Sequence, residues 1–215
     1  MRTHKAKSPS YSLKYEEMFA LLEQPLKGRD GVAEQKITSA EKRLGIKLPT
    51  ALREYYLVAG QQNKLNRAYN RLLRPSEWYL HKGKLCFMEE NQGAVVWGTN
   101  TGASDAAVYQ SPSNEDGLAK WYLENRKCSA FLMGMLVWQS TFGGGLPHTG
   151  SILCSKGMLA LLEKNWNFVS EINGMRTYVR EGQAASFLKW FQNDWCVFVG
   201  ATTPEGLALI KNDLK

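Results

Sequence analysis

Apolar side chains recur at helical spacing in three parts of the chain. The first part predicts a helix over residues 12–23, from Tyr15, Phe19 and Leu22. The second predicts a helix that reaches about Val58 and ends at Gly60. The third covers residues 115–142, which we expect to be mostly helical up to the glycines at 143–145.

Extended segments alternate with these helices. Lys84–Met88 and Ala94–Trp97 are predicted to be strands joined by a turn. Residues 167–172 and 175–180 form a predicted hairpin, with Asn173-Gly174 as its two-residue turn. A buried strand at 196–199 is followed by a last helix, with Thr203 as its N-cap.

The order of elements predicts an α+β fold, with a single mixed, mostly antiparallel β-sheet flanked by helices. We expect residues 1–9 to be a mobile tail and residues 10–215 to form one domain. Gly143–Gly150 is the best candidate for an internal boundary, although we do not expect it to separate independent domains. The hydrophobic content of 44% excludes an intrinsically disordered chain.

Residues 37–60 contain several signals for helix ends. Thr38 and Glu41 have the spacing of a capping box, which predicts a helix start at Thr38. Gly45 stands where a left-handed helix end is expected. Pro49 suits the first position of the next helix.

The sequence of these signals, and of those that follow, resembles the SUKH superfamily. The first half of the pattern is matched by Glu41, Leu44, Gly45, Leu48, Pro49, Leu52, Tyr55 and Tyr56. The second half is matched by Phe87, Glu90, Gln92, Gly93 and Trp97. The likeness covers about residues 37–110. Residues 105–108 depart from it, because they read Asp-Ala-Ala-Val where many members have Asp-Pro-Pro-Val.

The resemblance implies a function without catalysis. The superfamily includes fungal Smi/Knr-type cell-wall regulators and many bacterial immunity proteins. The resemblance therefore implies an immunity-type protein, which neutralises a cognate bacterial toxin by direct binding. Binding surfaces vary between members, so contact residues cannot be transferred to this chain.

Positive charge is concentrated in the first half of the chain. The net charge is +7, and residues 1–100 hold 17 Lys and Arg against 10 Asp and Glu. A basic stretch with interleaved aromatic side chains is the best candidate for a partner surface; it comprises Lys64, Arg67, Tyr69, Arg71, Arg74, Trp78 and Tyr79. The simpler interpretation is a solvated helix, since residues 65, 68, 69 and 72 have helical spacing.

Two kinds of partner fit this charge. Inhibitors of nucleases tend to be acidic, so a basic immunity-type protein needs an acidic partner or a binding face of opposite local charge. The alternative is a module that binds nucleic acid or regulates through the basic first half.

The sequence offers no catalytic, cofactor or metal motif. None of the three histidines, at 4, 81 and 148, has a carboxylate or nucleophile at motif spacing. The four cysteines are widely spaced and are predicted to be free thiols in a reducing compartment. The N-terminus lacks the apolar segment of a secretory signal, and no apolar run is long enough to span a bilayer. We therefore expect a cytoplasmic protein with no membrane partner.

Overall fold

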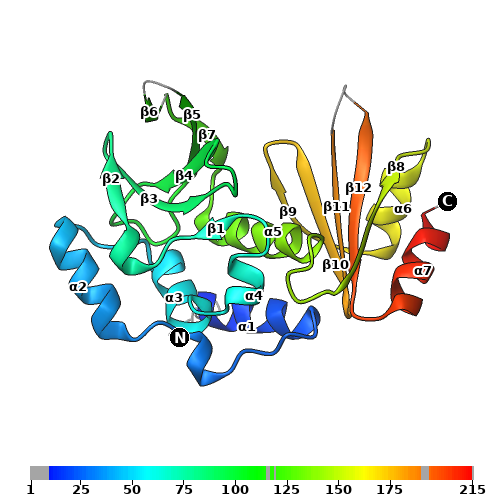
Figure 1. Ribbon diagram of the computed structural model, residues 1–215, viewed down its shortest axis with the longest axis horizontal. Coiled ribbons are helices and arrows are strands. Elements are labelled where there is room, and N and C mark those ends of the chain that lie inside the picture. Colours follow the sequence, from blue (N-terminus) through cyan, green and yellow to red (C-terminus); the bar gives the residue numbers. More distant parts are fainter. Residues whose placement is uncertain (1–9, 115–116, 119, 190–193, 215) are drawn as a thin grey trace, which may run out of the picture.

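The computed structural model describes residues 10–114, 117–118, 120–189 and 194–214 (Figure 1). The predicted tail at residues 1–9 lies outside the described residues. Within the described ranges, two antiparallel sheets lie on either side of the buried helix α5 (Cys128–Ser140).

The first sheet is built from the middle of the chain. Its order is β1-β3-β4-β5-β6, with β2 paired to β3 and β7 to β5. The strands are β1 (Arg71–Leu72), β2 (Tyr79–His81), β3 (Lys84–Glu89), β4 (Val95–Thr99), β5 (Val108–Asn114), β6 (Gly117–Leu118) and β7 (Tyr122–Asn125).

The second sheet is built from the C-terminal third and has the order β8-β12-β11-β10-β9. Its strands are β8 (His148–Leu153), β9 (Asn167–Ile172), β10 (Met175–Arg180), β11 (Gln183–Lys189) and β12 (Trp195–Ala201). The predicted hairpin is confirmed, and both of its turn residues, Asn173 and Gly174, have positive φ.

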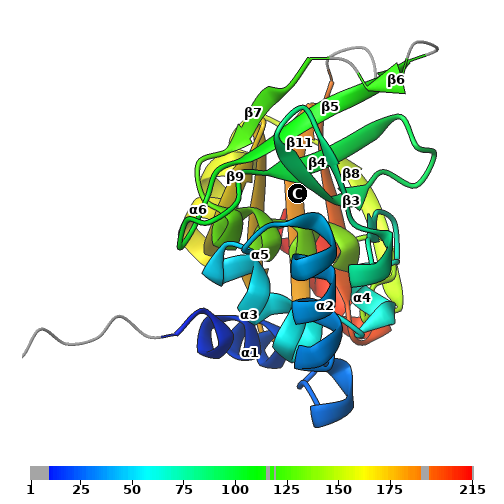
Figure 2. The ribbon, with the colours of Figure 1, turned by 90° about the vertical axis from the view of Figure 1, so that its left-hand side faces the viewer.

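The other helices lie below the first sheet or on the far side of the second (Figures 1 and 2). The N-terminal group is α1 (Tyr11–Leu21), η1 (Gly28–Asp30), α2 (Glu34–Leu44), α3 (Thr50–Ala59) and α4 (Asn63–Asn66). A second short 3-10 turn, η2 (Pro75–Glu77), follows β1. The C-terminal pair is α6 (Met158–Asn165) and α7 (Pro204–Asp213), and Thr203 caps α7 as predicted.

The prediction of an α+β fold is confirmed, but the prediction of a single mixed sheet is wrong. The described strands form two sheets, and every pairing among them is antiparallel. The reason lies in α5, which is buried on nearly all sides and therefore needs cover from both directions. The chain passes from the first sheet to the second through α5, and β8 begins at His148, inside the 143–150 segment.

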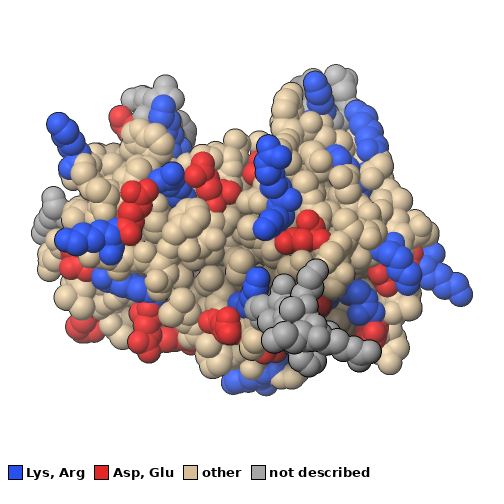
Figure 3. Space-filling view, turned by 180° about the vertical axis from the view of Figure 1, so that it is seen from behind, with Lys and Arg blue, Asp and Glu red and all other residues tan. Residues whose placement is uncertain are grey.

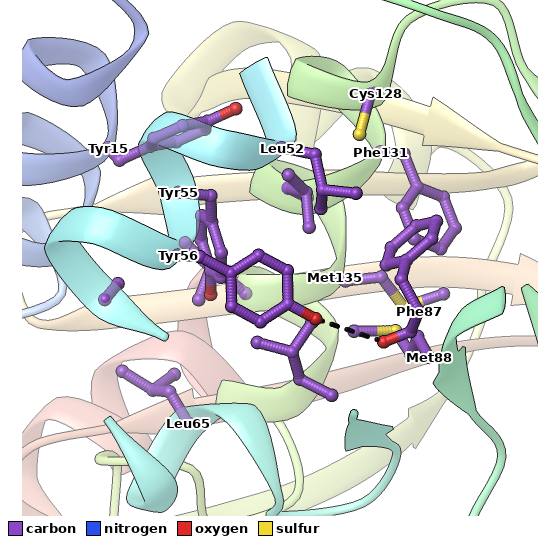
Figure 4. Packing of buried hydrophobic residues seen from close by; sticks show 14 of the residues in the cluster. Tyr15, Leu52, Tyr55, Tyr56, Leu65, Phe87, Met88, Cys128, Phe131 and Met135 are labelled. Carbon is purple, nitrogen blue, oxygen red and sulfur yellow. Dashed lines mark hydrogen bonds between the residues drawn. The ribbon is translucent and has the colours of Figure 1, made fainter. Parts of the chain in front are cut away.

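Aromatic side chains from α1, α3 and the first sheet form much of the core (Figure 4). The Tyr56 hydroxyl donates to the carbonyl oxygens of Leu73 (2.6 Å) and Phe87 (3.4 Å). The same core continues through α5 to the inner face of the second sheet. Gly134 allows this approach, because a Cβ there would lie 2.6 Å from Ile172 Cδ1.

The capping box predicted at Thr38 is wrong. Helix α2 begins at Glu34, so Thr38 is an exposed residue inside the helix. The Glu-Gln-Lys start favours a helix, and Glu34 also pairs with Arg53 at 2.8 Å. Gly45 does end α2 in the left-handed conformation, with φ of 65°. Pro49 is the N-cap of α3, one position before its predicted place.

Residues 115–142 are only partly helical. The described part begins with the strands β6 and β7, and the helix starts at Cys128. The Asn125 carboxamide oxygen accepts from Lys127 N at 2.9 Å, which turns the chain between β7 and α5. Asp105 then holds the helix start by accepting from Ser129 N (2.8 Å) and Ser129 Oγ (2.6 Å).

The helix suggested by the spacing of residues 65–72 also ends early. Helix α4 stops at Asn66, whose side chain binds Ala59 O and the Tyr55 hydroxyl, both at 2.6 Å. The Gln139 side chain then accepts from Tyr69 N (2.7 Å) and Asn70 N (2.9 Å), so these backbone groups are not available to a helix.

Candidate partner-binding site

The basic stretch does not form one continuous surface. Lys64, Arg67 and Arg74 are exposed. Arg71 is half-buried and neutralised, because it pairs with Glu77 at 2.6 Å and with Glu89 at 2.5 Å. These two carboxylates raise the pKa of Arg71, since they favour its charged form. Arg71 is therefore a structural ion-pair residue.

The aromatic members of the stretch turn inward. Trp78 is 1% exposed, and its indole N–H donates to the Tyr56 hydroxyl at 3.0 Å. It is a core residue, and the prediction that it belongs to a partner surface is wrong. Tyr69 is half-buried against Phe142, with ring centroids 4.1 Å apart. Tyr79 is half-buried, and burial raises the pKa of its hydroxyl.

A pocket of about 710 Å³ lies beside this stretch, and we call it the α2 pocket. Its walls are α2, the link between α3 and α4, and η2. The lining residues are Val32, Gln35, Lys36, Ser39, Ala40, Arg43, Gly60, Gln61, Asn63, Arg74, Pro75 and Ser76. The volume lies in the usual range for ligand-binding clefts. Figure 2 shows α2 on the side of the molecule that faces the viewer.

Among the described residues, three cations and no carboxylate line the α2 pocket. Lys36 and Arg43 lie two turns apart on one face of α2, and Arg74 reaches the pocket from η2. Among the described residues, no carboxylate forms an ion pair with any of the three. Arg43 Nη2 is fixed by donating to Pro75 O (3.0 Å) and Trp78 O (3.1 Å). The pocket is therefore locally positive.

Buried Glu41 ties the opposite face of α2 to the rest of the fold. The side chain is 4% exposed, and Oε1 accepts from Leu48 N at 2.9 Å. Its Oε2 lies 3.9 Å from Arg53 Nε and 4.0 Å from Lys47 Nζ. Helix α2 thus presents the pocket residues from a fixed position.

The other motif residues also have structural roles. Leu48 and Pro49 are buried and Leu44 is half-buried in the corner between α2 and α3. The Tyr55 hydroxyl donates to Asn66 Oδ1. Glu90 braces the β3–β4 turn, where its Oε2 accepts from Gln92 N (2.8 Å) and Ala94 N (3.3 Å). Gly93 has φ of 75° in that turn.

One carboxyl group is buried far from the pocket. Glu124 on β7 accepts from the Trp97 indole N–H at 3.3 Å through Oε1. Its Oε2 has no hydrogen-bond partner among the described residues. Burial raises the pKa of Glu124 to about 7.

Sequence reasoning missed Lys36 and Arg43. Their signal was present, because residues 36, 39 and 43 share one face of any helix that includes them. The predicted helix start at Thr38 left Lys36 outside the helix and concealed this alignment. Arg74 is the only predicted partner residue among those that line the pocket.

Elsewhere the charges of both signs are mixed. On the face seen in Figure 3, Lys and Arg side chains alternate with Asp and Glu side chains. Within the described parts of the chain, no group of three or more His, Cys, Asp and Glu side chains could hold a metal ion. Cys86, Cys128, Cys154 and Cys196 are free thiols.

Comparison of the chain with family models, curated proteins and solved structures finds no match. Among the described residues, no helix combines the length and apolar character needed to cross a membrane.

Proposed function

We propose that this protein is a non-enzymatic binding domain of the immunity type, which neutralises a cognate bacterial toxin in the cytoplasm by direct binding. The observation that carries the proposal is the α2 pocket, a preformed concave site with unpaired cations. The motif residues Glu41, Leu44 and Gly45, which carry part of the resemblance to the SUKH superfamily, lie on or directly after the helix that supports the pocket, and this placement supports the proposal.

The pocket also indicates which kind of partner the basic charge of the chain favours. A basic immunity-type protein needs either an acidic partner or a locally acidic binding face. In the part of the chain that the structure describes, the α2 pocket is lined by Lys36, Arg43 and Arg74 and by no carboxylate. Complementary potentials favour association, so the pocket supports an acidic partner. The exposed Lys64 and Arg67 extend positive charge along the chain next to the pocket residue Asn63.

A nucleic-acid-binding or regulatory module is the second candidate, and the net charge of +7 favours it. Proteins that bind single strands usually also offer exposed aromatic rings on which bases stack. In the basic stretch Trp78 is buried and Tyr69 packs against Phe142. The protein-binding candidate therefore has the better support.

The two candidates differ in how captured material responds to nuclease. The tagged protein is used to capture partners from a native bacterial lysate, with and without nuclease, at two salt concentrations. One stoichiometric protein that resists nuclease is the expected result. Material that disappears with nuclease and falls steeply with salt contradicts the proposal, because phosphate contacts release counterions.

A further inference from the structure

The cations of the α2 pocket start from separate points of the backbone. Lys36 and Arg43 are seven residues apart on α2. A rise of about 1.5 Å per residue places their Cα atoms roughly 10 Å apart along the helix axis. Arg74 joins from the wall formed by η2. A ligand with negative charge at more than one position can therefore pair with all three from these separate points.

The spacing fits an extended peptide with several carboxylates. An extended chain rises about 3.3 Å per residue, so acidic side chains two to four residues apart cover roughly 7–13 Å. Guanidinium groups bind carboxylates through charge-assisted N–H donors. Arg43 is oriented by the carbonyl oxygens of Pro75 and Trp78, which already accept from its Nη2, so its Nε and Nη1 N–H groups are the donors left for a ligand.

The remaining lining suits a peptide backbone. Gln35 and Asn63 are exposed at the pocket and offer both donors and acceptors. Ser39 and Ser76 add hydroxyls, while Val32, Ala40 and Pro75 supply apolar surface. No aromatic ring is among the lining residues of the described chain, so a nucleobase finds no ring to stack on.

We propose that the α2 pocket binds an extended acidic segment of the protein partner, with two or more Asp or Glu side chains held by Lys36, Arg43 and Arg74. The proposal deepens the proposed function and rests on it only for the claim that the segment belongs to a toxin. The chemistry of the pocket can be tested without that partner.

The test uses a matched pair of charge variants in the full chain. Lys36→Glu with Arg74→Glu reverses two pocket cations, and neither side chain forms an ion pair with a described residue. Lys42→Glu with Lys164→Glu is the control, because these lysines are exposed and do not line the pocket. Each substitution lowers the charge by two, so both variants fall from +7 to +3. Thermal melting of both variants checks that each is folded.

The probe is a seven-residue peptide, Gly-Glu-Ala-Glu-Ala-Glu-Gly, followed by NMR titration of the protein amides. The same peptide with Gln in place of Glu is the neutral control. We expect the Glu peptide to shift amides of α2 and η2, and the Gln peptide to leave them unchanged. Dissociation constants should rise at least about tenfold in the pocket variant and stay within about twofold in the control variant.

Several results overturn the inference. They are an absence of shifts at the pocket, equal binding of the two peptides, or equal weakening in both variants. Displacement of the peptide by inorganic phosphate or by a single-stranded oligonucleotide at lower concentration also overturns it, because the pocket is then a phosphate site.

The two proposals can fail separately. Peptide binding at the pocket without any captured protein leaves the inference standing and removes the toxin-binding function. A captured protein that binds the pocket variant as well as the wild type supports the function and overturns the inference.

Discussion

Replacing Glu124 with Gln should change how stability depends on pH. Glu124 is 9% exposed, its Oε1 accepts from Trp97, and its Oε2 lacks a partner among the described residues. Burial raises its pKa from 4.5 to about 7, so the folded protein holds this proton more tightly than the unfolded chain. The Gln variant keeps an acceptor for Trp97 but never carries a charge.

The sign and size of the change in stability with pH follow from this difference in proton affinity between the folded and unfolded protein. Below about pH 4.5 both states are protonated and the stabilising contribution is fully present. It is lost as the pH rises towards 7, because unfolding then releases a proton. Each tenfold difference in the proton equilibrium corresponds to about 1.4 kcal/mol, so the loss amounts to about 3 kcal/mol. Above pH 7 the folded protein contains a buried carboxylate.

The assay is urea unfolding followed by tryptophan fluorescence between pH 4.5 and 8. We expect the stability of Glu124→Gln relative to the wild type to increase by up to about 3 kcal/mol across this range. Glu181→Gln, at an exposed position, should stay within about 0.5 kcal/mol throughout. A difference for Glu124→Gln that is constant with pH, or that falls, refutes the reasoning.

Four further substitutions test the local structure by the same unfolding assay. Glu41→Ala should cost about 2 kcal/mol, because it leaves the buried Leu48 N–H unpaired; a cost below about 0.5 kcal/mol contradicts this role. Thr203→Ala should cost about 1 kcal/mol through loss of the cap on Gly206 N. Thr38→Ala should be neutral or slightly stabilising, since Thr38 lies inside α2. A decrease in the free energy of unfolding of about 1 kcal/mol would instead support a capping role for Thr38. Gly174→Ala should cost about 1 kcal/mol, because φ is 82° there; an unchanged midpoint argues against that turn.

Local signals in the sequence predicted local structure well. The Asn173-Gly174 turn, the left-handed Gly45 and the cap at Thr203 follow from the backbone preferences of single residues, and all three are present. The division into two sheets depends instead on how α5 is covered, which no single segment encodes. Residues 117–118 and 122–125 form strands because β5 is available to pair with them.

The candidate site was harder to predict for a related reason. The α2 pocket is assembled from three segments, of which the first and last lie more than 30 residues apart in sequence. Trp78 could not be recognised as a core residue, because its burial depends on Tyr56 and on the carbonyl of Leu73. Arg71 could not be recognised as neutralised, since Glu89 reaches it only through the β1–β3 pairing.

The most direct test of the central claim is a side-by-side capture experiment after nuclease treatment. Wild type, Lys36→Glu/Arg74→Glu and Lys42→Glu/Lys164→Glu are used at equal concentration, and bound protein is quantified by mass spectrometry. We predict one stoichiometric protein partner with the wild type and the control variant, and its loss with the pocket variant. Recovery of no protein after nuclease treatment, or equal retention of the same partner by all three forms, contradicts binding through the α2 pocket.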